Sequence, residues 1–277
     1  MASETCGLDI IDADYLREVR PGELVIMSED GTIETRQLAE GEEKLDIFEL
    51  VYFARHDSLL YGQRVNEVRR RFGEQLAEQH PPTTDNLDNI VVVPVPDTSI
   101  PAAEGYAEQL GLRHRQAIVK SRYIGRTFLQ PTQQQRHRQL RRKHNTIPEA
   151  VEGKDVIMID DSIVRLNTLP RLVEQASAAG ARSISVLIAS PPVRFPDFYG
   201  IDTPKQSELA AAHMTVEDMR KTINAKYLGF LSLGRMVAAT NYPADKFNLS
   251  CFTGEYPISI GTRMDEISTP ISMEFAD

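Results

Sequence analysis

Short runs of apolar residues, each ending in polar residues, divide most of the chain into alternating strands and helices. Residues 90–93, 156–159 and 184–189 form mostly apolar runs of the kind found in strands buried on both faces of a parallel sheet. Apolar residues recur with helical spacing at 64–79 and again at 169–176. Strands that alternate with helices in this way predict a doubly wound parallel α/β sheet with right-handed crossovers.

A smaller β-rich segment precedes this predicted sheet. Residues 23–27 and 32–38 flank a Ser-Glu-Asp-Gly turn and predict a β-hairpin, and 48–53 is a third strand candidate. A segment of this size buries too little apolar surface to fold on its own. We therefore divide the chain into a small β-rich segment, residues 1–58, and a main domain, residues 59–277.

Composition and charge exclude several classes of protein. The 277 residues carry a net charge of −9, which argues against a protein that binds nucleic acid over its whole surface. No apolar run approaches the roughly 20 residues that span a bilayer, and the first residues are not a secretory signal. Only Cys6 and Cys251 are present, which fits a reducing compartment. We expect a cytoplasmic protein with no membrane partner.

Two acidic residues after the apolar run 156–159 mark the place where we expect function. Asp160 and Asp161 lead into a polar turn, 162–168, and then a helix for which Thr168 is a suitable N-cap. Ligands bind at this carboxyl edge in doubly wound sheets. A sugar phosphate suits the place, because carboxylates bind hydroxyls or a metal and a helix N-terminus binds phosphate. A pair that merely caps a loop, or the phosphoacceptor aspartates of other doubly wound proteins, would look the same.

Two further stretches are chemically distinctive. A stiff loop at 94–99 follows the first strand of the main domain and precedes a helix at about 101–110, although a plain proline-rich turn is the alternative. Between Arg113 and Lys143 there are ten basic residues and no acidic one. This basic stretch would suit a nucleic-acid surface, a lid over a polyanionic small molecule, or a solvated face.

Several strings resemble those of one family. Residues 159–165 read Ile-Asp-Asp-Ser-Ile-Val-Arg, which resembles the phosphoribosyl pyrophosphate (PRPP) motif of type I phosphoribosyltransferases, in the form found in amidophosphoribosyltransferases. Residues 120–128 resemble the catalytic loop of that family, and the strings at 190–202, 215–219 and 251–257 match it too. The resemblance covers about residues 2 to 257.

The resemblance implies a role for each matching residue. Asp160 and Asp161 would hold the ribose hydroxyls and, with Thr98, a Mg²⁺ ion. Lys120, Arg122 and Tyr123 would be the catalytic residues that close on pyrophosphate. The implied PRPP-binding residues are Asp97, Ser99, Asp160, Asp161, Ser162, Arg165, Asn167 and Thr168.

The implied reaction is the displacement of pyrophosphate from carbon 1 of PRPP by ammonia, which gives 5-phosphoribosylamine for purine biosynthesis. Ammonia would come free or from a separate glutaminase subunit. The resemblance also implies a homo-oligomer with purine nucleotides as inhibitors. It favours the lid over a nucleic-acid surface for the basic stretch. The main rival is a non-catalytic regulator that senses PRPP or a purine nucleotide.

The N-terminal remnant and the cysteines depart from the family. Residues 1–58 resemble only the last part of its glutaminase domain, and the string around Cys6 matches a late strand there rather than the N-terminal nucleophile. We therefore expect a structural role for Cys6 and no glutaminase chemistry. Some members hold a structural iron–sulfur cluster with four cysteines. Those positions are here Asp46, Asp197, Asn248 and Cys251, so we expect no cluster.

The turn after the acidic pair is the third departure. The family usually has Arg-Gly-Thr-Thr, whereas this chain has Arg165-Leu166-Asn167-Thr168. Leucine, unlike glycine, does not adopt a positive φ freely, so Leu166 either carries strain of about 1 kcal/mol or gives the turn another shape. We expect weak PRPP binding.

Overall fold

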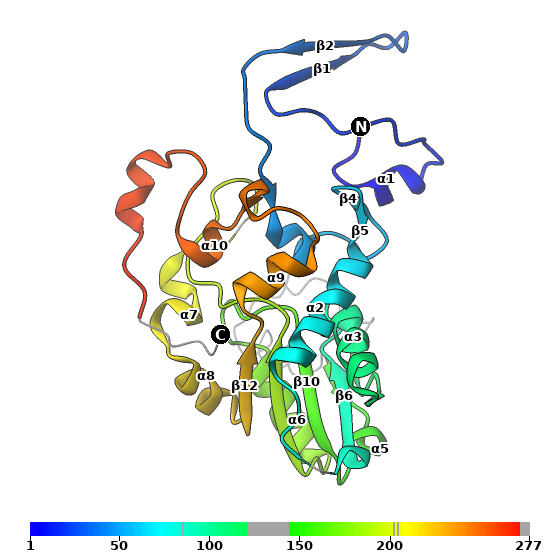
Figure 1. The fold of residues 1–277 in the computed structure, drawn as a ribbon, viewed down its shortest axis with the longest axis vertical. Helices are drawn as coiled ribbons and strands as arrows, with labels where there is room; N and C mark the ends of the chain where they lie inside the picture. The colour runs from blue at the N-terminus through cyan, green and yellow to red at the C-terminus, as the bar shows by residue number, and fades with distance from the viewer. Residues whose placement is uncertain (85, 121–143, 202, 204, 272–277) are drawn as a thin grey trace, which may run out of the picture.

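The computed structural model describes residues 1–84, 86–120, 144–201, 203 and 205–271. Its centre is a five-stranded sheet in the order β12-β11-β10-β6-β7 (Figure 1). All neighbouring strands in it are parallel, which confirms the predicted doubly wound sheet. The strands are β6 (Ile90–Pro94), β7 (Arg113–His114), β10 (Asp155–Asp160), β11 (Ser183–Ile188) and β12 (Tyr227–Phe230).

The strand order changes direction between β6 and β10. The chain passes from β6 outward to β7, then returns to β10 on the other side of β6 and continues outward to β11 and β12. The connections that leave the carboxyl ends of β6 and β10 therefore diverge. Such a switch point is where doubly wound sheets form a ligand-binding crevice.

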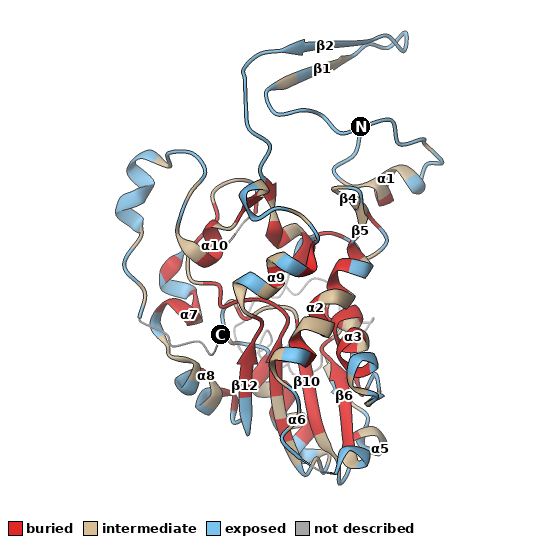
Figure 2. Ribbon diagram, in the orientation of Figure 1, coloured by how far each residue is buried: buried red, intermediate tan, exposed pale blue. Residues whose placement is uncertain are grey.

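Helices cover both faces of the sheet and divide the core in two (Figures 1 and 2). Successive residues of β10 point to opposite faces, so Ile157 and Ile159 pack into one apolar cluster and Val156 and Met158 into the other. The first cluster includes residues of α2 (Val65–Gln79), α3 (Ile100–Leu110) and α9 (Leu233–Ala239). The second includes residues of α5 (Pro148–Val151), α6 (Leu169–Ala178) and α8 (Val216–Ile223).

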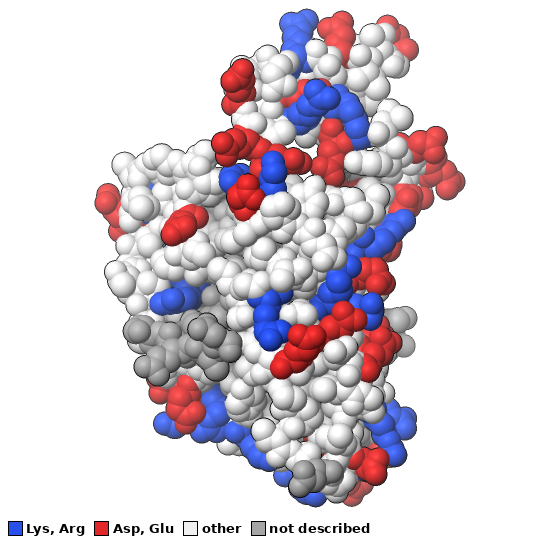
Figure 3. All heavy atoms as spheres, in the orientation of Figure 1, with Lys and Arg blue, Asp and Glu red and all other residues white. Residues whose placement is uncertain are grey.

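Two glycines let α2 and α3 pack in close contact. A Cβ atom on Gly73 would collide with the carbonyl oxygen of Ala102, and one on Gly105 with the carbonyl oxygen of Arg70. At the solvent side of the contact, Arg70 forms an ion pair with Glu108 of α3 at 3.3 Å. Charged side chains of both signs lie close together over α2 in Figure 3.

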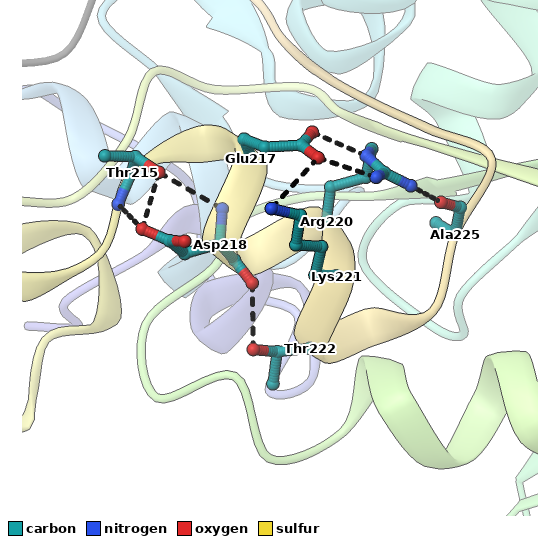
Figure 4. Close-up of polar contacts among 7 residues, drawn as sticks. All are labelled: Thr215, Glu217, Asp218, Arg220, Lys221, Thr222 and Ala225. Carbon is teal, nitrogen blue, oxygen red and sulfur yellow. Dashed lines mark hydrogen bonds and ion pairs between the residues drawn. The ribbon is translucent and has the colours of Figure 1, made fainter.

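Helix α8 follows Thr215, and its start is held by a capping box (Figure 4). The Asp218 amide donates to the Thr215 hydroxyl at 3.1 Å, and the Thr215 amide donates to the Asp218 carboxylate at 3.3 Å. Two of the free amides at the helix start are thereby satisfied. Thr168 takes the expected N-cap position of α6, but its side chain makes no capping bond there.

The N-terminal segment forms the expected hairpin and stands away from the main body (Figure 1). Strands β1 (Glu23–Met27) and β2 (Ile33–Gln37) pair antiparallel. Before residue 45 only Cys6, in α1 (Thr5–Asp9), is buried, so this segment has no core of its own. The remaining short elements are β3 (Leu45–Asp46), β4 (Leu59–Leu60), β5 (Gln63–Arg64), β8 (Ile118–Lys120), β9 (His144–Thr146), α7 (Ala210–His213), β13 (Phe247–Asn248) and α10 (Ser250–Thr253).

The prediction of a strand at residues 48–53 was wrong. This run forms η1 (Glu49–Phe53), a single stretch of π-helix. The buried residues Ile47, Phe48, Leu50, Val51 and Ala54 explain why, because their spacing is helical rather than alternating. Across the part of the chain that the structure describes, no helix is both long and apolar enough to span a bilayer.

Candidate functional site

A cavity of about 570 Å³ opens where β6 and β10 end. The loop after β6 and the turn after β10 both line it, so the switch point of the sheet coincides with a site large enough for a small ligand. The structure brings the following predicted site residues to this cavity: Asp97, Thr98, Lys120, Asp160, Asp161, Ser162, Arg165, Asn167 and Thr168. The predicted catalytic residues Arg122 and Tyr123, and most of the basic stretch, lie outside the described residues.

The acidic pair sits at the floor of the cavity. Asp160 is 9% exposed, and one of its carboxylate oxygens accepts a hydrogen bond of 3.0 Å from the amide of Asp161. Burial, together with the charge of Asp161, raises the pKa of Asp160 well above its usual value. Burial also raises the pKa of Asp161, although the Ser162 hydroxyl and the charge of Arg69 counteract it. The pair therefore lacks a full counter-charge, and a cation or a set of ligand hydroxyls would supply one.

An ion pair between two cavity-lining residues joins the loop after β6 to the end of β8. The Asp97 carboxylate pairs with the ammonium of Lys120, at the end of β8, at 2.9 Å. Both side chains are about half exposed, so the pair is weak and an anionic ligand can compete for the Lys120 charge. Thr98 lies next to Asp97 and also lines the cavity.

Ser99 is placed differently from the other predicted binding residues. It is 1% exposed and is absent from the cavity lining. Its hydroxyl lies 2.5 Å from the carbonyl oxygen of Val95 and 2.8 Å from that of Ile159. Its hydrogen bond thus ties the loop to β10, and the predicted contact of Ser99 with PRPP stays a prediction.

The turn after the acidic pair adopts the left-handed conformation at Leu166. Its φ is +55°, which lies in the region that glycine occupies without strain. Of the two outcomes expected from the sequence, a strained leucine or a turn of another shape, the structure has the strained leucine. The Leu166 side chain packs against the second apolar cluster, which compensates for part of the strain. Asn167 and Thr168 are exposed to the cavity. Arg165 pairs with Glu208 at 2.8 Å.

Sequence reasoning missed an aromatic wall on the side of the cavity formed by η1. Its rings are in contact, with Tyr52 packing edge-on against Phe53 at 5.8 Å between centroids. Tyr52 and Phe53 are both about half exposed. The apolar residues around these rings have helical spacing, and that pattern would have predicted that the rings lie on the exposed face of a helix. Outside the loops at 94–99 and 162–168, the cavity-lining residues missed are Phe48, Tyr52, Phe53, His144, Leu169, Ile201 and Thr203.

The four positions that hold cluster cysteines in some relatives come together away from this cavity. The amide of Asn248 donates to Asp46 at 3.3 Å and to Asp197 at 3.1 Å, and the Ser250 hydroxyl donates to Asp197 at 3.3 Å. Burial, with the two acids nearby, raises the pKa of the Cys251 thiol well above its usual value. A neutral thiol among hydrogen-bonded oxygen and amide groups does not fit an iron–sulfur cluster.

This polar cluster should make stability depend on pH. Burial and the neighbouring Asp197 raise the pKa of Asp46 to about 7, above the value of about 3.9 in an unfolded chain. The contribution of protonated Asp46 to the free energy of unfolding is therefore fully present near pH 4 and is lost as the pH rises to 7. We expect Asp46→Asn to increase the free energy of unfolding at pH 8 by ~2–4 kcal/mol, because a pKa unit corresponds to about 1.4 kcal/mol.

Urea unfolding from pH 5 to pH 8 measures this effect. The exposed Asp245 provides the control, since its side chain lies in solvent close to β13 and Asp245→Asn should keep the wild-type slope. If the free energy of unfolding of Asp46→Asn depends on pH as steeply as that of the wild type, then Asp46 is not the group responsible for the pH dependence.

Helices on both faces of a parallel sheet, a switch point, and an acidic pair beside the turn at 162–168 are the features that the sequence led us to expect of a type I phosphoribosyltransferase fold. Among the described residues, no group of three or more His, Cys, Asp or Glu is arranged to hold a metal by itself.

Over most of its length the chain is similar to known amidophosphoribosyltransferases. Over 261 residues, 94% of this chain, the sequence is 44% identical to amidophosphoribosyltransferase of Synechococcus elongatus and spans 52% of it. Over 264 residues it is 42% identical to the Bacillus subtilis enzyme and spans 54% of it. No protein-family model matches the chain.

A solved structure agrees with these relatives. Glutamine PRPP amidotransferase from B. subtilis, in complex with ADP and GMP, superposes with a TM-score of 0.82 and 41% identity, over 93% of this chain and 56% of that one. The chain is thus homologous to the amidophosphoribosyltransferases, and the resemblance noted in the sequence is confirmed. It spans about half the length of the curated relatives it matches.

Proposed function

We propose that this chain transfers the phosphoribosyl group of PRPP to ammonia, as a glycosyltransferase of the amidophosphoribosyltransferase type in purine biosynthesis. The acidic pair after β10 carries the proposal, because it lines one cavity together with the loop after β6 and the turn at 162–168. The relatives are named as enzymes, which does not favour the alternative of a non-catalytic regulator.

Mg²⁺ is the proposed cofactor. Asp160, Asp161 and Thr98 offer two carboxylates and a hydroxyl, the hard oxygen donors that this ion prefers. The raised pKa values of the two acids fit the same idea, since a divalent cation would restore both to the ionised form. When bound, the ion would neutralise charge on the pyrophosphate leaving group.

The chain itself mainly has to position the reactants. The nitrogen lone pair of ammonia forms a bond to carbon 1 of the ribose, the bond from carbon 1 to the pyrophosphate oxygen breaks, and pyrophosphate leaves with the electron pair. The nitrogen then loses a proton to water. Asp160 and Asp161 would hold the ribose hydroxyls. Lys120 would leave its ion pair with Asp97 and bind the departing pyrophosphate instead. The proposed roles of Arg122 and Tyr123 in closing the site remain predictions.

The partners follow from the same proposal. Ammonia would arrive free or from a separate glutaminase-type subunit. A surface for such a partner is available on the N-terminal segment, where large apolar side chains between residues 10 and 38 are exposed and uncovered. These are Ile10, Ile11, Tyr15, Leu16, Val19, Leu24, Met27, Ile33 and Leu38. Purine nucleotides as inhibitors, a homo-oligomer and a cytoplasmic location complete the proposal, and nucleic acid is not expected as a partner.

The purified chain should release pyrophosphate from PRPP when Mg²⁺ and an ammonium salt are both supplied, and should not do so when glutamine replaces ammonium. The Cys6 thiol is 6% exposed and is in no position to attack glutamine. Pyrophosphate release is measured with a coupled assay and PRPP binding by calorimetry. Absence of both would contradict the proposed function. Glutamate release that disappears in Cys6→Ala would contradict the absence of glutaminase chemistry.

A further inference from the structure

A second cavity, of about 660 Å³, lies toward the amino ends of the strands. Residues of β10, β11 and β12 line it, together with the chain between α2 and β6, which runs alongside these strands (Figure 1). Asp155 begins β10 in this cavity, whereas Asp160 ends the same strand in the cavity at the switch point. At ~3.3 Å per residue, the two ends of β10 are roughly 17 Å apart. No described residue lines both cavities, so the second is a separate place, and its volume is typical of small-molecule sites.

The sheet presents small polar side chains to this second cavity. Ser183 and Ser185 of β11 point to the same face as Leu187, because side chains alternate along a strand. A strand inside a parallel sheet normally carries apolar side chains on both faces, and these fill the space beneath the covering layer. Here the two serines leave that space open. In the described part of the chain no group forms a hydrogen bond with the Ser185 hydroxyl, which is therefore available to a ligand.

One wall of the second cavity consists of two rings that hydrogen bonds hold in place. Nε2 of His80 lies 2.9 Å from the carbonyl oxygen of Phe230, so it must donate, and Nδ1 accepts from the Tyr227 hydroxyl at 2.9 Å. The two ring centroids are 5.8 Å apart. Gly229 permits this arrangement, because a Cβ atom there would lie 3.0 Å from the Tyr227 ring and 3.1 Å from the His80 ring. The protein thus offers fixed aromatic surface to a ligand.

The rim of the second cavity carries a positive charge that is not offset. The guanidinium of Arg182 donates to the Asp155 carboxylate at 2.9 Å, so these two charges compensate each other. Lys226 also lines the cavity, and its ammonium forms no ion pair with any residue that the structure describes. Burial lowers the pKa of His80, so the imidazole adds no charge at neutral pH. Lys226 is therefore the group that would attract an anionic ligand.

We propose that the second cavity binds a small planar aromatic acid, with its ring against His80 and Tyr227, its carboxylate at Lys226 and a polar atom at Ser185. A purely apolar ligand would leave the Ser185 hydroxyl without a partner, and a cationic ligand would meet the charge of Lys226. A sugar phosphate would leave the aromatic wall uncovered, so the ligand differs in class from PRPP. This inference goes beyond the proposed function and does not depend on it.

Indole-3-acetate and tryptamine are the probes that test the charge of the ligand, because they carry the same ring with opposite charge. Calorimetric titration of the full chain should show binding of indole-3-acetate, and binding of tryptamine that is roughly threefold to tenfold weaker. Lys226→Glu should reverse this order. Lys246→Glu is the matched control: this lysine directly precedes β13 and does not line the cavity, so the order should stay that of the wild type.

Ser185→Leu tests the place of binding. Leucine fills open space beside the sheet, so the midpoint of thermal unfolding should not fall. Indole-3-acetate should bind roughly tenfold more weakly or not at all, because its ring would overlap the new side chain. Asn167→Leu puts the same side chain into the cavity at the switch point and should leave the affinity for indole-3-acetate unchanged.

Four results overturn the inference. These are no binding of indole-3-acetate at millimolar concentration, tryptamine binding as tight as that of indole-3-acetate, an unchanged order in Lys226→Glu, and loss of binding in Asn167→Leu but not in Ser185→Leu. If Ser185→Leu does not fold, the reversal in Lys226→Glu decides, because that side chain lies on the surface.

Discussion

Asp161→Asn is expected to weaken Mg²⁺-dependent PRPP binding roughly tenfold to hundredfold, because a charged hydrogen bond contributes about 1.5–3 kcal/mol and tenfold corresponds to 1.4 kcal/mol. The same change should not lower the stability of the free protein. Burial raises the pKa of Asp161, so its ionised form is already disfavoured, and the neutral amide removes repulsion toward Asp160. Calorimetric titration with PRPP and Mg²⁺, with thermal unfolding in parallel, measures both effects.

Asp155, at the opposite end of the same strand, is the matched control. Its carboxylate bonds to Arg182 and to the Ser183 hydroxyl, and these bonds lower its pKa to about 2. Asp155→Asn should therefore reduce the free energy of unfolding at neutral pH and leave PRPP affinity unchanged. If Asp161→Asn binds PRPP as tightly as the wild type, the acidic pair is structural and the assignment of the site is wrong.

The double change Leu166→Gly with Asn167→Thr is expected to tighten PRPP binding by roughly threefold to tenfold. At φ +55° a leucine holds the turn at a cost of about 1 kcal/mol that glycine does not carry, so glycine leaves the backbone freer to close around a phosphate. Leu166 also lines the cavity. A threonine hydroxyl at 167 would add a short donor. The stability of the free protein should not rise, because removing the packed leucine side chain loses burial of similar size.

Leu166→Ala separates the two causes. Alanine removes most of the side chain but keeps the cost of positive φ, so any gain in affinity that it shares with the double variant comes from space in the cavity. Equal PRPP affinities of the wild type and the double variant would show that the turn tolerates Leu166 and Asn167, and that the site is not weakened by them.

The sheet could be predicted from the sequence because its strands are buried on both faces. Residues 90–93 and 156–159 are continuous apolar runs, too short for most helices, that end in polar loops. The order of strands and helices then placed the acidic pair at the correct edge. The positive φ at Leu166 also could be anticipated, since the position is one where a glycine is expected.

The rest of the site depended on contacts between residues distant in sequence. The run at 48–53 was interpreted as a strand although its apolar spacing is helical, and in the folded chain the Arg69 side chain donates to the carbonyls of Leu50 and Glu49 within it. Ser99 has the residue type of a phosphate ligand, but the carbonyl of Ile159, 60 residues away, takes its hydrogen bond.

The short pairing of β3 with β13 has a consequence for how the protein folds. It joins residues 202 positions apart, through the bond from Asn248 to Asp46. Closing so long a loop costs entropy that local contacts do not, so it tends to follow formation of the sheet. Phe48, which begins the aromatic wall, comes two residues after β3. In a nascent chain that has not yet emerged past residue 248, the aromatic wall would therefore be held only by its contacts with α2, and its second anchor would form after the sheet.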